Sequence, residues 1–287
     1  MTKQYIELGK RILDQGQWVK NERTGNDCLT LIHANLRYDV SNLEYPIPTT
    51  RKAPFKLAVA ELLGYLRGYS NAADFRKLNC KTWDANSNLN EAWLNNQNRK
   101  GEDDMGMVYG AAARNWPKVD EDGSVSSIDT IYSVLTKITE HKDDRGLIIS
   151  FWNPGVFHRG CLRPCMHTHQ FSILNNTLYC DSFQRSTDVA LGLTANMQQC
   201  YLLVAVMAQI SKLKAGIAYH TSVNNHIYRN QLELFKEQMK RTPHGPPVLV
   251  INPNIKTIED LMTWVTPDDF VLEDYTPQAA IKYPFSV

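Results

Sequence analysis

The residues with the clearest chemical potential are a cysteine and an arginine–serine pair, Cys165 and Arg185-Ser186. A thiol beside a fixed guanidinium ionises more readily than a free thiol, whose pKa is about 8.5, and becomes a nucleophile near neutral pH. The alternative interpretation is a buried cysteine close to a surface arginine. Three chemically different groups follow at close spacing, namely Asp188, Gly192 and Asn196. Their density favours a catalytic site.

A β-hairpin and a long helix must position these groups. Residues 169–174 and 177–183 alternate in polarity, and the turn-forming pair Asn175-Asn176 separates them. A hairpin brings its far ends together, so we expect the cysteine to lie beside residues 184–186. The apolar run from residue 191 to 213 predicts a buried helix directly after the hairpin.

Periodicity elsewhere predicts alternating helices and strands. Apolar residues mark one face of an N-terminal helix, and further helices are expected over 55–66 and 227–239. Strands are expected over 29–36, 147–152 and 216–222. The mixture predicts a single α+β domain over residues 1–287, a large mixed β-sheet packed with helices. The polar, Asn-rich stretch of about 86–105 is interpreted as a variable surface insertion.

Composition limits the classes of function. The 287 residues are 43% hydrophobic and 21% charged, with a net charge of +1. No basic surplus indicates nucleic-acid binding, and no apolar run is long enough to span a bilayer. The six cysteines are scattered without metal-ligand spacing, and no signal peptide is recognisable. We therefore expect a cytoplasmic protein without a metal, a membrane or a nucleic-acid partner.

Several motifs resemble those of the thymidylate synthase family. The pattern P-C-x(4)-Q-F at 164–171 and the pattern Q-R-S-x-D-V-x-L-G-L-x-x-N at 184–196 resemble its central motifs. Residues 20–25 resemble its phosphate loop, and residues 106–110 resemble its G-P-x-Y-G motif. Residues 225–228 resemble its sugar-binding H-x-Y, and residues 281–287 resemble its C-terminal lid. The resemblance extends over nearly the whole chain and implies the family's α+β fold and its chemistry.

The resemblance implies one-carbon transfer to C5 of a pyrimidine nucleotide, most simply dUMP. Cys165 would add to C6 of the ring, and Glu61 and Tyr109 would order water and move protons near the base. Asn196 would face O4 and N3–H, because an amide presents both a donor and an acceptor. Asp188 would bond the pterin of the second substrate.

Substrate-binding roles are implied in the same way. The residues expected to bind the nucleotide are Arg23, Gln184, Arg185, Ser186, His226 and Tyr228. The resemblance adds Arg145 from a partner subunit, which implies a homodimer. Gly146 stands where the family has a second arginine, so one phosphate donor is missing.

The one-carbon donor implied is 5,10-methylenetetrahydrofolate, with no metal. The residues expected to bind it are Trp83, Leu162, Asp188, Gly192, Ala195 and Val287. Five positions on this side have lost a bulky or typical family side chain, namely Pro54, Asn86, Ala113, Met166 and Ala195. The loss of bulk should admit water, which would compete with hydride transfer and give a hydroxymethyl product. We therefore predict a dUMP hydroxymethylase.

Four alternatives stay open at this point. Thymidylate synthase, making dTMP and dihydrofolate, is the closest. A dCMP or CMP hydroxymethylase is less favoured, because related enzymes carry Asp where Asn196 stands. An inactive dimeric nucleotide-binding homologue would not need an intact Cys165 and Glu61. A Cys–His hydrolase using His167 or His169 lacks an acidic partner and an oxyanion motif.

Overall fold

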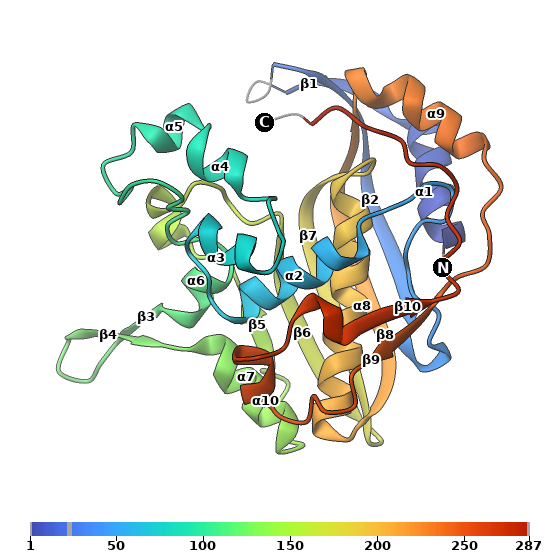
Figure 1. The fold of residues 1–287 in the computed structure, drawn as a ribbon. Coiled ribbons are helices and arrows are strands. Elements are labelled where there is room, and N and C mark those ends of the chain that lie inside the picture. Colours follow the sequence, from blue (N-terminus) through green and yellow to red (C-terminus); the bar gives the residue numbers. More distant parts are fainter. Residues whose placement is uncertain (1, 22–24, 286–287) are drawn as a thin grey trace.

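The computed structural model describes residues 2–21 and 25–285 of the chain. Within this part, six strands form one mixed sheet in the order β1-β2-β8-β7-β6-β5, and helices cover one of its faces (Figure 1). The predicted fold class, a single-domain α+β structure with a large mixed sheet, is confirmed.

The helices are α1 (Thr2–Gln15), α2 (Phe55–Leu66), α3 (Ala72–Lys77), α4 (Asp84–Asn88), α5 (Glu91–Leu94), α6 (Gly110–Arg114), α7 (Thr130–Thr139), α8 (Gly192–Ser211), α9 (Leu232–Lys240) and α10 (Ile258–Met262). The strands are β1 (Gln17–Lys20), β2 (Asp27–Asp39), β3 (Trp116–Val119), β4 (Val125–Ile128), β5 (Ile148–Ser150), β6 (Met166–Leu174), β7 (Thr177–Asp188), β8 (Lys214–Tyr228), β9 (Val248–Ile251) and β10 (Phe270–Glu273).

The central hairpin is made by β6 and β7, as predicted. Leu174 pairs with Thr177, and the two residues of the turn, Asn175 and Asn176, have φ values of 49° and 58°. Asparagine tolerates this left-handed conformation better than most residues, which suits it to a two-residue turn. At the other end of the hairpin, residues 165 and 185 lie side by side.

β7 and β8 pair in parallel, and α8 makes the crossover between them. α8 packs on both strands, and α2 packs on α8 as a second layer. Because α8 is enclosed on almost every side, it is apolar nearly all round. The helix over 55–66 matches its predicted bounds.

The predicted helix over 227–239 was wrong in its first residues. β8 continues to Tyr228, and α9 begins only at Leu232. The strand is extended because Asp188 pairs with His226 and the Val189 N–H donates to the His226 carbonyl oxygen. Tertiary pairing therefore overrides a helical pattern here.

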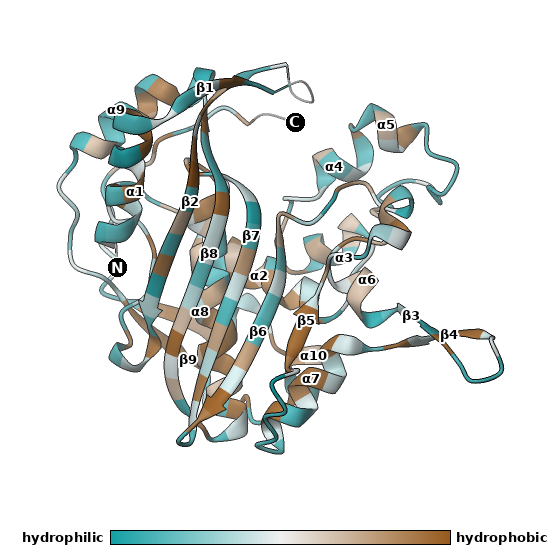
Figure 2. Ribbon diagram, turned by 180° about the vertical axis from the view of Figure 1, so that it is seen from behind, coloured by the Kyte–Doolittle hydropathy of each residue, from teal (hydrophilic) through white to brown (hydrophobic). Residues whose placement is uncertain are grey.

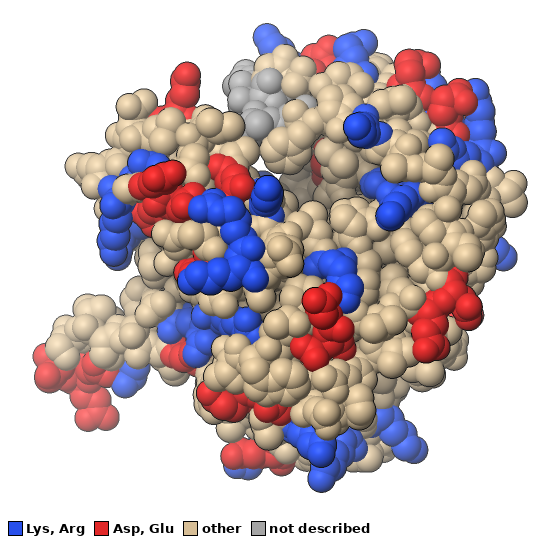
Figure 3. All heavy atoms as spheres, in the orientation of Figure 1, with Lys and Arg blue, Asp and Glu red and all other residues tan. Residues whose placement is uncertain are grey.

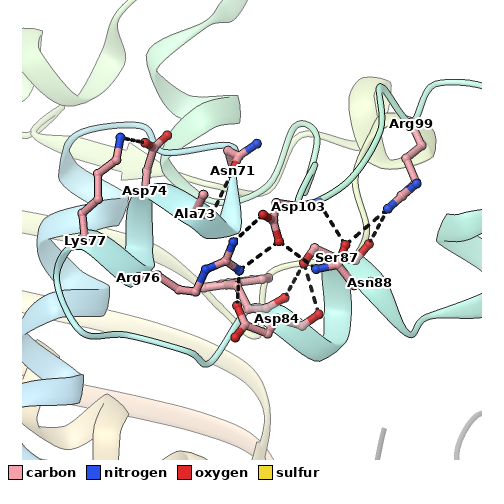
Figure 4. Close-up of polar contacts among 11 residues, drawn as sticks. Asn71, Ala73, Asp74, Arg76, Lys77, Asp84, Ser87, Asn88, Arg99 and Asp103 are labelled. Atoms are coloured by element: carbon pink, nitrogen blue, oxygen red, sulfur yellow. Dashed lines mark hydrogen bonds and ion pairs between the residues drawn. The ribbon is translucent and has the colours of Figure 1, made fainter.

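Polar contacts hold the stretch from α3 to residue 105 together (Figure 4). Arg76 bonds Asp84 at 2.8 Å and Asp103 through both of its terminal nitrogens. Asn88 donates to Asp103 at 2.8 Å and accepts the Asp103 backbone N–H at 2.9 Å. Arg99 donates to the Ser87 carbonyl oxygen at 3.3 Å. These contacts explain why the stretch is rich in polar residues although it includes three short helices.

The second face of the sheet is open. Seen from behind, β2, β8, β7 and β6 lie in front of the helices without a covering layer (Figure 2). Tyr219 and Val223 are exposed on this side, and along β8 they alternate with the buried Ala218, His220 and Ser222. The other face carries the packed core and, at one end, the residues of the candidate site.

Candidate active site

The Cys165 thiol lies next to a fixed guanidinium. Arg185 Nη2 is 3.8 Å from Cys165 Sγ. Arg185 is held in place because Nε donates to the Pro164 carbonyl oxygen and Nη2 to the Arg163 carbonyl oxygen, at 2.9 and 3.0 Å. The guanidinium also lies over the Trp152 ring. A cation fixed beside sulfur favours the thiolate, so this geometry suits the expected nucleophile.

Tyr109 contacts the same cysteine in a strained conformation. Its φ of 42° and ψ of −118° lie outside the regions that suit a residue with a side chain. Its hydroxyl accepts the Cys165 backbone N–H at 2.9 Å, and its ring stacks on Tyr65 with centroids 4.4 Å apart. Burial raises the Tyr109 pKa well above its usual value, which keeps the hydroxyl protonated. Strain at a residue that touches the expected nucleophile points to function.

Glu61 brings a buried carboxyl group to this site. Its Oε2 accepts an N–H from Gln199 at 2.8 Å. Burial raises the Glu61 pKa above its ordinary value, and hydrogen bonds from Gln199, Tyr65 and Thr82 oppose the rise. A carboxyl group with a raised pKa is suited to hold and release a proton during a reaction.

Asn196 lies one turn into α8, and two glutamines hold it. Its Oδ1 accepts from Gln184 Nε2 at 2.9 Å, and its Nδ2 donates to Gln199 Oε1 at 3.2 Å. One N–H and one lone pair of the amide stay available for a ligand. Gln184 is itself only 1% exposed. It therefore lies behind Asn196 rather than at an open binding surface.

A series of contacts links the expected catalytic residues. Tyr109 bonds the Cys165 backbone and stacks on Tyr65, and Tyr65 hydrogen-bonds Glu61. From Glu61 the series continues by hydrogen bonds through Gln199, Asn196 and Gln184. On the surface, a hollow separates the part that carries α4 and α5 from the C-terminal segment, and Lys and Arg side chains lie along its rim (Figure 3).

Asp188 lies where β7 ends and is connected to the C-terminal segment. Its Oδ1 accepts the backbone N–H groups of Ala190 and Leu191, and its Oδ2 accepts from Gln231 Nε2 at 2.8 Å. Gln231 Nε2 also donates to the Pro284 carbonyl oxygen at 3.1 Å. Burial raises the Asp188 pKa, and the hydrogen bonds from Gln231 and the backbone oppose the rise.

The expected sugar-binding residues lie at the end of β8. His226 pairs with Asp188 across the parallel strands, and its Nδ1 is 2.9 Å from Asn224 Oδ1. The His226 and Tyr228 rings meet edge to face at 5.1 Å. Ser186 pairs with Asn224 one step earlier along the same two strands. The strand pairing therefore brings these side chains to the same end of the sheet as Asp188.

Trp83 belongs to an aromatic cluster behind Tyr109. It is buried and meets Tyr109 and Tyr65 edge to face, with centroids 5.7 and 6.2 Å away. Its indole N–H is buried and finds no hydrogen-bond partner within the described residues. Trp83 therefore packs against Tyr109 and does not form an open surface for a ligand. Leu162, Gly192 and Ala195 are each partly exposed.

Of three further expected binding residues, the structure describes only Arg145. Arg23 and Val287 lie outside the described residues. Arg145 is exposed in the turn before β5, and in the described part of the chain its guanidinium has no hydrogen bond or ion pair. The protomer therefore does not itself place Arg145 beside Cys165.

Two glutamines at the site were missed by sequence reasoning. Gln199 bridges Asn196 and Glu61, and its spacing of three residues from Asn196 on one helix could have signalled it. Gln231 joins Asp188 to the C-terminal segment. No local pattern marks Gln231, because its role depends on contacts between distant parts of the chain.

Two absences hold for residues 2–21 and 25–285. No group of three or more His, Cys, Asp or Glu side chains in that range could hold a metal ion. In the same range, none of the helices combines the length and apolar composition that a bilayer crossing needs.

Comparison with known proteins places the site in a family context. The family model described as thymidylate synthase matches residues 3–287. The chain is 57% identical over 286 residues to the thymidylate synthase of Idiomarina loihiensis, covering 99% of this chain and 100% of that protein. It is 58% identical to the thymidylate synthases of Pseudoalteromonas translucida and Colwellia psychrerythraea, covering 99% of this chain and 100% and 99% of theirs.

These relatives overturn the predicted hydroxymethylase. Proteins 57–58% identical over the whole chain are thymidylate synthases, which favours the alternative that makes dTMP. The structure gives a physical reason for the error. Ala113 is fully buried and Met166 is 2% exposed with its sulfur against Cys200. The core encloses these two positions, so the changed residues at Ala113 and Met166 do not open a path for water. Pro54 is exposed, and Asn86 and Ala195 are partly exposed.

Proposed function

Because the chain belongs to the thymidylate synthase family, we propose that it converts dUMP to dTMP. The second substrate is 5,10-methylenetetrahydrofolate and the second product is dihydrofolate. The observation that carries this proposal is the series of contacts that joins Cys165 to Asn196 through Tyr109, Tyr65, Glu61 and Gln199. It supplies a thiol, a proton carrier and a base-recognising amide in one place.

The reaction begins at C6 of the uracil ring. The Cys165 thiolate, favoured by Arg185 beside it, forms a bond to C6, and the ring electrons move to O4. The available N–H of Asn196 donates to O4 as negative charge develops there, and the available lone pair of its oxygen accepts N3–H. C5 becomes nucleophilic as a result. Such polar stabilisation is strongest in a partly buried site.

When bound, methylenetetrahydrofolate supplies the one-carbon unit and then a hydride. Glu61 takes part in moving the proton that leaves C5, because burial has raised its pKa. Tyr109 stays protonated and holds the Cys165 backbone, so that the sulfur can add and later leave along the same direction. Asp188 offers a buried carboxyl group to the pterin. The C-terminal segment at Pro284 covers this side through Gln231.

The remaining binding residues surround the nucleotide. Arg185 and Ser186 bind the phosphate together with Arg23, because a planar guanidinium suits that anion. His226 and Tyr228 bind the sugar from the end of β8. Arg145 of a second copy supplies a further cation, and Gly146 in place of the second arginine leaves the phosphate with one cation fewer.

A homodimer completes the site in this proposal. The open face of the sheet, with Tyr219 and Val223 exposed, is the surface that a second copy would cover (Figure 2). Arg145 is exposed and unpaired within the described residues, which supports a role in another subunit. Mixing inactive Cys165→Ser and Arg145→Ala proteins tests this sharing. Mixed dimers should regain turnover, because one of their two sites holds both residues. No regain would contradict the shared site.

The six cysteines of the chain are thiols, and none is joined to another by a disulfide in the described residues. Reduced cysteines are typical of a reducing compartment and support a cytoplasmic location.

Mass spectrometry of the products tests the reaction itself. The purified protein with dUMP and methylenetetrahydrofolate should give dTMP and an equal amount of dihydrofolate. Cys165→Ser should lose this turnover and still bind dUMP. A hydroxymethylated nucleotide without dihydrofolate, or wild-type turnover by Cys165→Ser, would refute the proposal.

A further inference from the structure

A chain of six hydrogen-bonded side chains runs through the interior and ends at the candidate site. Its members, in order, are Tyr38, His220, Gln184, Asn196, Gln199 and Glu61. They come from β2, β8, β7, α8 and α2, so the chain crosses the sheet and both helices above it. The successive contacts measure 3.2, 2.7, 2.9, 3.2 and 2.8 Å.

The Glu61 end gives this chain a direction. An ionised Glu61 only accepts hydrogen bonds, so in that state Gln199 turns its amide nitrogen toward Glu61 Oε2. The carbonyl oxygen of Gln199 then faces Asn196 and requires a donor. Asn196 must therefore point Nδ2 at Gln199 and Oδ1 the other way.

The Gln184 end fixes the same direction independently. Gln184 Nε2 donates to the Ser186 backbone carbonyl oxygen at 3.0 Å, and a carbonyl oxygen also only accepts. The same nitrogen donates to Asn196 Oδ1. Gln184 Oε1 must then accept from His220 Nε2, which leaves His220 Nδ1 to accept from the Tyr38 hydroxyl. Asn196 is thus fixed from both sides.

His220 is well suited to hold one orientation. It is fully buried, and burial lowers its pKa to about 4, so the ring is neutral over the working range of pH. A neutral imidazole has one donor and one acceptor nitrogen. Gln184 Oε1 only accepts, so it requires the form with the proton on Nε2, and the Tyr38 hydroxyl supports that form by donating to Nδ1. The Nε2 proton in turn disfavours turning of the Gln184 amide.

The orientation of Asn196 matters because uracil and cytosine present opposite patterns. Uracil offers an acceptor at O4 and a donor at N3, whereas cytosine offers a donor at its 4-amino group and an acceptor at N3. A reversed Asn196 amide would match cytosine. We propose that His220 and Tyr38 are positioning residues that make the site select uracil over cytosine, by preventing reversal of the Asn196 amide.

This inference rests on the proposed function in one respect, the placement of Asn196 against the pyrimidine. A reversal would bring two nitrogens together at Gln184 and two oxygens together at Gln199. A fully hydrogen-bonded reversal therefore requires both glutamines to turn as well. His220 and the Ser186 carbonyl oxygen hold Gln184, and Glu61 holds Gln199.

The experiment measures dissociation constants of dUMP and dCMP by titration calorimetry, which needs no turnover. His220→Leu removes the donor to Gln184 and should lower the preference for dUMP roughly 10-fold or more. Tyr38→Phe removes only the hydroxyl that donates to His220, and it should lower the preference for dUMP over dCMP by a smaller factor. His220→Gln keeps an N–H donor of similar reach and should keep most of the preference.

Matched controls come from the same core. His169 is also buried, with Nδ1 2.8 Å from Ser182 Oγ, but it lies outside the hydrogen-bonded chain. Tyr45 is fully buried, and its hydroxyl finds no partner within the described residues. His169→Leu and Tyr45→Phe should leave the ratio of the two constants unchanged.

The outcomes separate the two proposals. If the wild-type protein binds dUMP no better than dCMP, the proposed function itself fails. If it discriminates but Tyr38→Phe and His220→Leu discriminate equally well, the positioning role fails. Should His220→Leu not fold, Tyr38→Phe compared with Tyr45→Phe decides, because both changes remove a single oxygen. A general loss of packing would weaken both nucleotides equally and leave the ratio unmoved, which also refutes the role.

Discussion

Replacing Gly110 by alanine should damage both stability and turnover. A Cβ at this position would lie 1.7 Å from the Tyr65 carbonyl oxygen, where separations below 3.0 Å do not occur. The distance from the new Cβ to the Tyr65 carbonyl oxygen must increase from 1.7 Å to at least 3.0 Å. The contacted atom belongs to the backbone, so no side-chain rotation can relieve the clash. Because Tyr109 precedes Gly110 and stacks on Tyr65, the shift must pull the Tyr109 hydroxyl away from the Cys165 N–H.

The size of both effects follows from this geometry. Overpacking of a tight contact costs about 1–3 kcal/mol of unfolding free energy. For a chain of this length such a cost lowers Tm by roughly 2–6 °C. A displacement of about 1 Å in the groups that hold a nucleophile lowers kcat/KM by roughly 100-fold.

The assay compares thermal unfolding and dihydrofolate formation in Gly110→Ala and a matched control. A methyl group added at Gly245 would have no heavy atom within 4 Å, and Gly245 is not in the left-handed region, so Gly245→Ala should change neither quantity. Wild-type kcat/KM in Gly110→Ala, with or without a lower Tm, would refute the link between the close approach and the nucleophile.

Three other predictions follow from the site. Asn196→Asp should shift the preference toward a cytosine nucleotide by roughly 10-fold or more, since its pair of hydrogen bonds to uracil is replaced. If the ratio of kcat/KM for dUMP to kcat/KM for dCMP is the same in wild type and variant, Asn196 does not lie in the base pocket. Glu61→Gln should abolish most turnover. It should also have a higher Tm than the wild type, by a difference that grows as pH rises. The pKa of Glu61 is raised in the folded state, so the contribution of Glu61 to stability is complete below its unfolded-state pKa and is lost as pH rises through its folded-state pKa. A Tm difference between wild type and Glu61→Gln that does not grow with pH would contradict this. Gln231→Leu breaks the link from Asp188 to Pro284 and should raise KM for the folate without changing the Kd for dUMP; an unchanged folate KM would exclude the link.

The sequence was sufficient for elements with strong local signals. The turn at Asn175-Asn176 and the apolar helix at 55–66 lie where local patterns predicted them. The end of β8 was assigned to a helix because the apolar pair Ile227-Tyr228 suits either structure. Only the pairing of β8 with β7, which no local pattern reveals, decides between them.

The candidate site was predicted in part for the same reason. Cys165 and Arg185 meet because a hairpin must bring its ends together. His220 and Gln184 meet only through the register of two parallel strands joined by a long crossover, which sequence does not specify. The hydroxymethylase error arose because lost bulk was equated with open space. At Ala113 and Met166 the surrounding core closes the space.

The uninterrupted order of β7, α8 and β8 has a consequence for the synthesis of the protein. Five residues proposed to bind the nucleotide emerge from the ribosome in one continuous stretch, namely Arg185, Ser186, Asn196, His226 and Tyr228. Gln231 and Pro284, whose contact lies on the folate side, are 53 residues apart. A nascent chain can therefore pair β7 with β8 and bring these five residues together before Pro284 is available. The link from Asp188 to Pro284 forms only after Pro284 has left the exit tunnel.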